Sequence, residues 1–524
     1  MKSKWFAGVL LVAVLAVAFF DRYLGLTIIG MEGSDATEYW EVAKHWFEGD
    51  RSLTRAYRPL TFGLYEWSFH LFGVTDSSIK FLNFGLDLGT IGMLMGICYF
   101  LTRNLWFVLA AAAVYALNPY AIHYARNEIP HPAGGFFITS YAISVLLWLR
   151  YQSQNWLLLV AGLLLGCAAN THPDLGFAGL GVGLLLVWLA YRKQVNLWPA
   201  VFLVLGFAAT FIFVFNVWSY AEFRESMSTN ADVHKTDFWK GLGRVPKLLE
   251  ISLYYATSKP FAWIFFLASI AYYRWACVTK AVASHSYRLM PVALDMLMFS
   301  HVLLHAVLAG RHMAPRVFFP FAPLVILSFL LKFYLVLPHL KPKVKAWAIW
   351  VFAAVIVFAV ASERHYRTDW RVAKYQVPHP FRYMYDVAKD LATEDRRVLL
   401  MPMTLYHDRP AVLSEAYLGD RAVYMLKTPV AANLRQLIER EKIAYVFFSK
   451  KLLDRRVPRV HSWGRGHFRE RLKVYFGLRH DEYSAEEVRK RFLASLVDLQ
   501  PQQISSTDYG DLYALSARIG QGSK

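Results

Sequence analysis

Cysteine is scarce in this sequence. Only Cys98, Cys167 and Cys277 occur among its 524 residues, and none belongs to a CxxC pair or a Cys/His cluster. Neither a disulfide framework nor a structural zinc site is therefore expected. The sequence also lacks a visible internal repeat, which many secondary transporters carry. Its predicted inner loops are too short for a nucleotide-binding fold, which favours a sugar donor delivered within the membrane over a soluble nucleotide sugar.

Acidic residues are outnumbered by basic ones. The chain has 38 Asp and Glu against 57 Lys and Arg, for a formal net charge of +19. Basic residues are enriched in the cytoplasmic loops of membrane proteins, where they contact anionic lipid. No motif that reads nucleic acid accompanies the charge. The charge therefore predicts membrane lipids as partners, and no nucleic acid.

Long apolar runs are abundant, and 56% of the residues are hydrophobic. Runs of this length can cross a hydrocarbon core of roughly 30 Å, and they must do so as helices, because lipid satisfies no backbone hydrogen bonds. The first run has no small-residue cleavage pattern before Asp21, so we expect an uncleaved helix. About eleven spans are predicted, at 5–20, 79–101, 105–122, 134–149, 156–170, 175–191, 197–219, 259–273, 289–309, 316–337 and 345–362.

The basic residues also predict an orientation. If Lys2 and Lys4 lie in the cytoplasm, all the remaining short basic loops lie on the same side. These loops contain Arg103, Arg150, Arg192 with Lys193, 274–288, and Lys341 to Lys345. An odd number of spans then leaves the C-terminal segment outside. We predict a membrane module over 1–362, with outer helices within 21–80 and 220–259. An extracytoplasmic, periplasmic α/β domain is predicted over 363–524. The expected location is the bacterial inner membrane.

The C-terminal segment has the pattern of a soluble α/β domain. Alternating and short buried-type runs predict strands at 397–403, 444–448 and 512–515. Amphipathic periodicity predicts helices at 381–394, 431–441 and 485–499.

The first outer loop carries the most informative polar residues, Asp35 and Arg58. A carboxylate at the membrane face can act as a general base, and an arginine can hold a phosphate with two parallel hydrogen bonds. Each residue also has a simpler interpretation. Asp35 fits the N-cap of a helix that starts at Ala36, and Arg58 fits an interfacial side chain that reaches toward the lipid headgroups.

The motifs around these residues resemble the GT-C superfamily of membrane glycosyltransferases. The branch resembled holds the protein O-mannosyltransferases and the aminoarabinose transferases of lipid A. Gly33-Ser34-Asp35 and Arg58-Pro59-Leu60 match its acidic and basic-Pro motifs, and Leu71-Phe72-Gly73-Val74 matches an apolar-Phe-Gly-Val turn. The resemblance covers about residues 1–362. Tyr57 stands where some members carry a glutamate implicated in metal binding, so a divalent metal is left open.

Further candidates lie in the other predicted outer loops. Arg126 precedes Glu128 and His131-Pro132, where relatives often have an arginine followed by Asp-Pro. His172 lies in Thr171-His172-Pro173-Asp174, and Arg311 and Arg316 open a late span in a segment like the family's Arg-aromatic-x-x-Pro. The resemblance implies phosphate binding by Arg58, Arg126, Arg311 and Arg316. Glu128, His131 and His172 are the candidates for a second polar or acidic position.

The resemblance implies transfer of a sugar from a polyprenyl-phosphate donor to an acceptor hydroxyl at the outer face, with inversion. The sugar would be a hexose or a pentose, and the acceptor a lipid, a glycan or a protein. Asp35 would deprotonate the acceptor, and Arg58 would neutralise the leaving phosphate, helped by Arg126 or Arg311. A transporter or flippase for a lipid-linked saccharide is the alternative, and a non-catalytic scaffold is the third.

Three other features of the apolar runs have structural interpretations. His301 and His305 have a spacing that allows a shared metal, but a buried, hydrogen-bonded pair is favoured. Gly179, Gly181 and Gly183 resemble a phosphate loop superficially, and close helix packing explains them better. Asp87 is expected to bond a neighbouring helix.

Overall fold

The computed structural model describes most of the predicted membrane module and parts of the C-terminal segment. The described residues are 2–23, 26, 34–50, 58–75, 77–217, 238–256, 259–278, 286–308, 315–354, 356–357, 391–393, 395–401, 422–424, 438–449, 493–494, 496–506 and 510–515. The chain divides into two compact units. The membrane unit comprises 1–26, 42–74 and 78–372, and the sheet unit comprises 27–41, 75–77 and 373–524.

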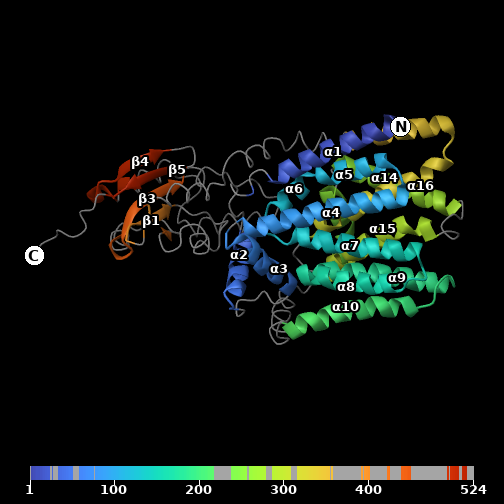
Figure 1. The fold of residues 1–524 in the computed structure, drawn as a ribbon, viewed down its shortest axis with the longest axis horizontal. Helices are drawn as coiled ribbons and strands as arrows, with labels where there is room; N and C mark the ends of the chain where they lie inside the picture. The colour runs from blue at the N-terminus through green and yellow to red at the C-terminus, as the bar shows by residue number, and fades with distance from the viewer. Residues whose placement is uncertain are drawn as a thin grey trace, which may run out of the picture. The chain divides into compact units, whose positions relative to one another are not determined.

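Helices make up the membrane unit (Figure 1). The longer ones are α1 (Lys2–Tyr23), α4 (Ser78–Thr102), α7 (His131–Arg150), α8 (Trp156–Thr171), α9 (Ala178–Tyr191), α10 (Trp198–Val217), α14 (Lys259–Val278), α15 (Met290–Leu308) and α16 (Ala322–Val336). The shorter ones are α2 (Ser34–Phe47), whose first residues belong to the sheet unit, α3 (Pro59–Phe72), α5 (Leu105–Ala116), α6 (Pro119–Ala125), α12 (Phe238–Leu242) and α13 (Val245–Ala256). Short 3-10 helices are η1 (Pro173–Phe177), η3 (Ser286–Leu289), η4 (Pro315–Phe321) and η5 (Leu337–His339). A further helix covers 342–354.

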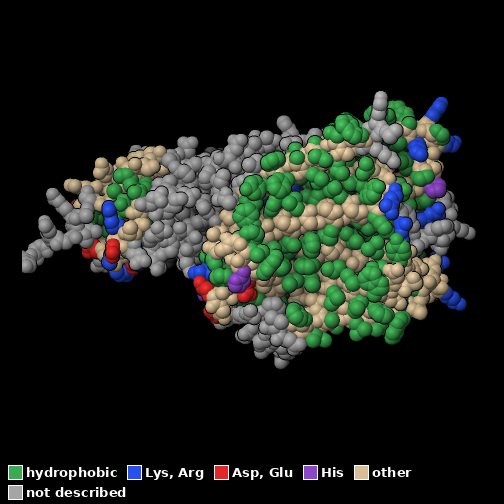
Figure 2. All heavy atoms as spheres, viewed as in Figure 1, with side chains coloured by type: hydrophobic (Ala, Val, Ile, Leu, Met, Phe, Trp, Pro, Cys, Tyr) green, Lys and Arg blue, Asp and Glu red, His purple; other side chains and the backbone are tan. Residues whose placement is uncertain are grey.

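Six helical segments of the described chain are long and apolar enough to cross a membrane: Trp5–Tyr23, Ser78–Thr102, His131–Arg150, Pro173–Tyr191, Met290–Val307 and Val317–His339. Shorter apolar helices at Leu105–Ala116, Trp156–Thr171 and Trp198–Thr210 also coincide with predicted spans. Hydrophobic side chains cover most of the face of the bundle that Figure 2 shows, as expected of a surface that faces lipid. The chain is an integral membrane protein, whereas the total of eleven spans stays a prediction.

The predicted span 105–122 is interrupted in the structure. Helix α5 ends at Ala116, and α6 begins at Pro119. The break has a local cause, because the Asn118 side chain accepts hydrogen bonds from the backbone N–H groups of Tyr120 and Ala121. Asn118 thus caps α6, and the proline after it suits the first position of a helix. Helix α6 is therefore a separate short helix that does not continue α5, and it leads toward the start of α7.

Close backbone contact and buried charge hold the helices together. A Cβ on Gly181 would lie 2.5 Å from the carbonyl oxygen of Met296, so α9 and α15 can approach this closely only at glycine. This bears out the packing interpretation at Gly181, whereas a Cβ on Gly183 would meet nothing within 4 Å. Asp87 of α4 pairs with Arg22 of α1 and accepts a hydrogen bond from the Tyr115 hydroxyl of α5. The expected bond from Asp87 to a neighbouring helix is therefore confirmed.

The sheet unit contains a mixed five-stranded sheet in the order β2-β1-β3-β5-β4. Its strands are β1 (Arg397–Met401), β2 (Ala422–Tyr424), β3 (Ile443–Ser449), β4 (Gln502–Ser506) and β5 (Gly510–Ala514). Strands β2, β1 and β3 are parallel, and β3, β5 and β4 pair antiparallel. The predicted strands coincide with β1, β3 and β5. The predicted helices at 381–394 and 485–499 lie largely outside the described residues, and only 438–440 of the helix at 431–441 is described as helical.

Basic side chains gather at the end of the bundle where α1 begins (Figure 2). Arg103 follows α4, Arg150 ends α7, and both guanidinium groups stack on the Phe100 ring, at 5.5 and 4.8 Å from its centroid. Two basic residues predicted to be cytoplasmic thus lie together at one end of the helices. This end is opposite to the starts of α4 and α7.

We expect a reporter that is active only in the cytoplasm to be inactive when fused after residue 400. The same reporter fused after Lys193 should be active, because Lys193 follows α9 in a predicted inner loop. A periplasm-active reporter at the two positions should give the reverse pattern. Strong cytoplasmic activity after residue 400 would overturn the predicted outer location of the sheet unit.

Candidate functional site

Several helix ends meet at the opposite end of the membrane unit. Helices α3 and α7 begin there, and α8 ends there, as does α15. The Thr61 hydroxyl of α3 donates to the carbonyl oxygen of Thr171 at the end of α8, at 3.3 Å. The Tyr65 hydroxyl donates to the main chain of Glu128, just before α7, at 2.9 Å. Helix α3 is thereby fixed across the ends of α7 and α8.

Arg58 occupies the N-cap position of α3, directly before Pro59. Proline is well suited to the first turn because a helix leaves its first N–H groups unbonded. The helix N-terminus adds a partial positive charge to that of the guanidinium. The bond from Thr61 to Thr171 brings the first turn of α3 to the residue before His172. The charge of Arg58 helps to lower the pKa of the His172 imidazole, although burial has the larger effect. The half-buried arginine therefore lies among the helix ends of this site.

His172 and Asp174 follow α8 and bring the polar residues of α15 into the same cluster. The Nδ1 of His172 lies 3.8 Å from the Oδ2 of Asp174. His305 contacts the same carboxylate oxygen through Nδ1 at 3.0 Å, and Nδ1 of His301 contacts the Asp174 main-chain oxygen at 2.8 Å. The expectation of a buried, hydrogen-bonded histidine pair is borne out, with Asp174 as the shared partner.

Glu128 is held in a buried ion pair beside this cluster. Its Oε1 lies 3.2 Å from Nζ of Lys80 on α4, and both side chains are 0% exposed. Asn83, one turn further along α4, donates to the carbonyl oxygens of Asn127 and Ile129 at 2.7 and 3.0 Å. Helix α4 thus fixes the segment between α6 and α7. Burying a charge is costly unless it is paired, which explains why Glu128 and Lys80 occur together.

The structure brings some of the predicted site residues together and leaves others undescribed. Arg58, Glu128, His131 and His172 lie at this end of the unit, and the rings of His131 and His172 are 6.5 Å apart. Arg126 is buried at the end of α6. Arg311 lies outside the described residues, and Arg316 lies in η4 without a described side chain.

Asp35 lies in the first turn of α2, which begins at Ser34, so it does not occupy the N-cap of a helix starting at Ala36. Its side chain is not among those that the structure describes.

Solved structures share this arrangement of helices, although their sequences have diverged. ArnT from Cupriavidus metallidurans bound to undecaprenyl phosphate matches with a TM-score of 0.53 and 14% identity, over 100% of both chains. The apo state of the same protein matches with a TM-score of 0.51 and 15% identity, over 98% of both chains. ArnT, a lipid A aminoarabinose transferase, belongs to the GT-C superfamily. The chain has the GT-C fold.

The GT-C fold was predicted from motifs in the first outer loop, and at the level of fold the resemblance is confirmed. No protein-family model and no curated protein matches the sequence. Sequence reasoning missed Lys80, Asn83 and Tyr65, the residues that fix the start of α7. Lys80 and Asn83 are three residues apart at the start of a span, and a polar pair so close to an apolar run is a usable signal.

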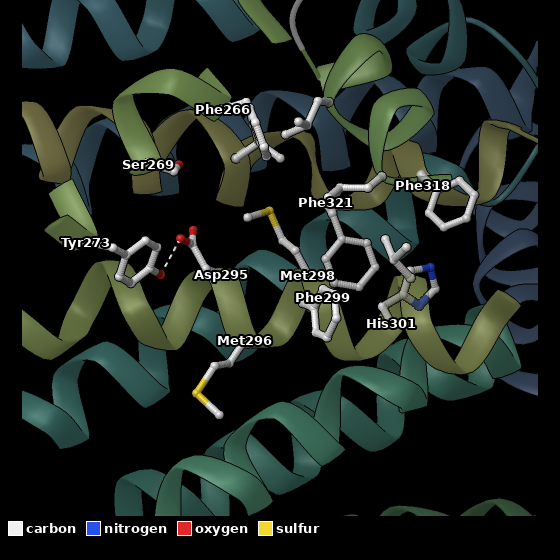
Figure 3. Close-up of a pocket in the computed structure, with 14 residues that line it drawn as sticks. Phe266, Ser269, Tyr273, Asp295, Met296, Met298, Phe299, His301, Phe318 and Phe321 are labelled. Carbon is white, nitrogen blue, oxygen red and sulfur yellow. Dashed lines mark hydrogen bonds between the residues drawn. The ribbon is translucent and has the colours of Figure 1, made fainter. Parts of the chain in front are cut away.

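An apolar cavity of about 320 Å³ lies beside the site in this GT-C unit. Phe266, Phe299, Phe318 and Phe321 contribute to its walls, from α14, α15 and η4 (Figure 3). His301 lines one end, and the other end carries Asp295, which accepts a hydrogen bond from the Tyr273 hydroxyl at 2.6 Å. His301 therefore belongs both to the cavity wall and to the cluster around Asp174. In the described part of the chain, no group of three or more His, Cys, Asp or Glu side chains is arranged to hold a metal ion.

Replacing Glu128 with alanine should lower stability strongly. The change would leave the buried Lys80 ammonium without this carboxylate, at a cost of about 3–5 kcal/mol. Lys80→Met combined with Glu128→Leu should restore most of the melting temperature of the solubilised protein. A Glu128→Ala variant that melts like the wild type but transfers no sugar would instead make Glu128 a reacting residue.

Acid should destabilise the folded chain in part through His172. Burial, then the charge of Arg58, lowers the pKa of this imidazole to about 3, against weaker opposition from Asp174. An ordinary imidazole has a pKa of about 6.5, so below that pH His172 binds a proton in the unfolded chain but not in the folded chain. The free energy of unfolding therefore decreases as the pH falls from about 6.5 toward 3. Between about pH 6.5 and pH 5 the loss is about 2 kcal/mol.

The His172→Asn variant should therefore lose less melting temperature than the wild type between about pH 7.5 and pH 5. His70→Asn, at an exposed position of α3, is the matched control. Equal acid sensitivity in all three proteins would contradict a neutral, buried His172.

Proposed function

We propose that the chain is a membrane glycosyltransferase that transfers a sugar from a polyprenyl-phosphate donor to an acceptor hydroxyl at the outer face, with inversion. The observation that carries the proposal is Arg58 at the N-terminus of α3, within a cluster of polar side chains at one end of a GT-C bundle. The related structure of ArnT, bound to undecaprenyl phosphate, supports a donor of this class. The expected setting is the bacterial inner membrane, with the site facing the periplasm.

Arg58 suits a phosphate for two physical reasons. A guanidinium presents parallel N–H donors that match two phosphate oxygens. The N-terminus of α3 adds its own partial positive charge, and helix N-termini are common phosphate sites. Arg126, Arg311 and Arg316 remain candidates for a second contact with the phosphate.

The transfer requires a base and a site for the leaving phosphate. The acceptor oxygen forms a bond to the anomeric carbon as the bond from that carbon to the phosphate oxygen breaks. The electron pair leaves with the phosphate, whose growing charge Arg58 stabilises. The proton of the acceptor hydroxyl passes to Asp35, the base that the family resemblance implies.

The apolar cavity supplies a place for part of the prenyl chain. Its walls are largely aromatic and aliphatic, and at His301 it meets the polar cluster. A lipid phosphate needs this combination, because its headgroup requires charged partners while its tail is stabilised by leaving water. The remaining chain would extend into the bilayer.

Purified full-length protein should convert undecaprenyl-phosphate sugars into undecaprenyl phosphate and a glycosylated acceptor. We would test a panel of hexose and pentose donors with lipid, glycan and protein fractions as acceptors, with and without a chelator. Product formation supports the proposal, and the chelator arm tests the open question of a divalent metal. Movement of the donor across vesicle membranes without covalent transfer would instead identify a flippase.

A further inference from the structure

Asp174 is held by two histidines that lie one turn apart on α15. His301 fixes the backbone of Asp174, and His305 fixes its side chain, at 2.8 and 3.0 Å. The main-chain oxygen can only accept a hydrogen bond, so Nδ1 of His301 must carry the proton. Nδ1 of His305 donates to the ionised carboxylate in the same way. Both the position and the direction of the carboxylate are therefore set by α15.

The two imidazoles are themselves fixed by aromatic rings of η4. The ring of His301 stacks on Phe321 at a centroid distance of 4.4 Å, and His305 meets the edge of Phe318 at 5.0 Å. His301 also lines the apolar cavity, as Figure 3 shows. Rings packed on several sides lose little further entropy when they hold a partner. The carboxylate is thus pre-organised before any ligand arrives.

Asp174 is partly exposed, whereas His305 is buried. Its side chain is 22% exposed, compared with 3% for His305. The same carboxylate oxygen lies 3.8 Å from His172, which is close enough to Arg58 to respond to its charge. A fixed negative charge near a phosphate site would repel the phosphate itself. It suits a neighbouring group that offers hydroxyl donors and becomes positively charged, and the glycosyl group of the donor has both properties.

We propose that the Asp174 carboxylate contacts the sugar of the lipid-linked donor, and that His305 is a positioning residue that acts through Asp174. This inference rests on the proposed function. During transfer, bond formation and bond cleavage occur at the anomeric carbon as described above, and the acceptor proton goes to Asp35. No bond forms to Asp174. The carboxylate keeps its charge and stabilises the positive charge that develops on the glycosyl group.

The first test compares two probes on the full-length protein, undecaprenyl phosphate and its sugar-carrying forms. Asp174→Asn should bind undecaprenyl phosphate like the wild type, because Arg58 is intact. It should bind the sugar-carrying probes about tenfold to a hundredfold more weakly, the range for a hydrogen bond to a charged group. Turnover should fall about 10²–10³-fold. Unchanged binding and turnover, or equal weakening with both probes, would overturn the proposal.

The second test separates positioning from mere packing. The amide N–H of His305→Asn can replace the Nδ1 donor, so this variant should keep a substantial part of the turnover. His305→Leu has no donor and should resemble Asp174→Asn, with a larger loss in kcat than in donor binding. Ser300→Ala, also on α15, controls for small packing changes in this helix, because the Ser300 hydroxyl bonds to the Leu297 carbonyl oxygen one turn earlier. Equal turnover in His305→Asn and His305→Leu would overturn the positioning role.

The proposed glycosyltransferase activity and the proposed role of Asp174 can be refuted separately. A wild-type protein that makes no product from any donor would refute the glycosyltransferase. The binding comparison would still decide whether Asp174 contacts the sugar. Conversely, an active wild type with a fully active Asp174→Asn variant would refute only the role of Asp174.

Discussion

Replacing Arg58 with alanine should reduce transfer from an undecaprenyl-phosphate sugar by about 10²–10³-fold, with much weaker binding of undecaprenyl phosphate. The guanidinium lies at the N-terminus of α3, where it can meet the phosphate in the ground state and carry more of its charge as the bond to the sugar breaks. Both donor binding and turnover should therefore decrease. Equilibrium binding and single-turnover rates in the same detergent or nanodisc preparation would measure the two effects.

A lysine at position 58 should restore part of the activity, because the charge remains while the paired N–H geometry is lost. Arg103→Ala is the matched control. Arg103 stacks on Tyr99 and Phe100 at the opposite end of the bundle, so it represents an arginine with an interfacial role only. If Arg58→Ala and Arg103→Ala both retain native donor binding and turnover, Arg58 is an interfacial residue too.

Local physics explains which parts of the membrane unit the sequence could predict. Apolar runs long enough to cross lipid must be helical, so nearly every predicted span coincides with a helix. The exception, 105–122, fails because one asparagine and one proline start a new helix inside a run of suitable hydropathy. Hydropathy averaged over a window cannot register a cap made by a single side chain.

In the sheet unit, the central strands could be predicted from the sequence, whereas the edge strands could not. Strands β1, β3 and β5 are predicted because they are apolar and their central residues Leu399, Val446 and Leu512 are buried. Strand β4 has the polar sequence Gln502–Ser506, lies at the edge of the sheet and is largely exposed. Strand β2 has only three residues. Each edge strand forms through pairing with one neighbour, β4 with β5 and β2 with β1, so its own residues carry little of the signal.

Some features of the candidate site could be predicted from the sequence, and others could not. The convergence of short polar loops on one end follows from the order of the spans, and Arg58 and His172 do lie in one cluster. The pairing of Glu128 with Lys80, and of Asp174 with His301 and His305, joins residues that are far apart in the chain. Sequence spacing placed the two histidines on one helix face. Only the tertiary structure shows that Asp174 is their shared hydrogen-bond partner.

Asp35→Asn should nearly abolish sugar transfer while leaving the protein folded and able to bind undecaprenyl phosphate. A general base contributes roughly 10²–10⁴ in rate, and asparagine cannot accept the acceptor's proton. The structural alternative predicts a much smaller effect. Asp35 lies in the first turn of α2, where a carboxylate that only interacts with the helix dipole is worth about 0.3–1 kcal/mol of stability. Loss of a catalytic role would therefore lower the rate of sugar transfer, whereas loss of a structural role would lower the melting temperature.

Glu38→Gln is the matched control, because it removes the charge of a second carboxylate one turn further along α2. Both variants change the dipole interaction of the helix, but only Asp35→Asn should remove the base. Transfer by Asp35→Asn at near the native rate, with a melting temperature shifted as in Glu38→Gln, would make Asp35 a helix-stabilising residue. The proton of the acceptor hydroxyl would then have to pass to another group, and the order of the mechanism proposed for this site would be wrong at its first step.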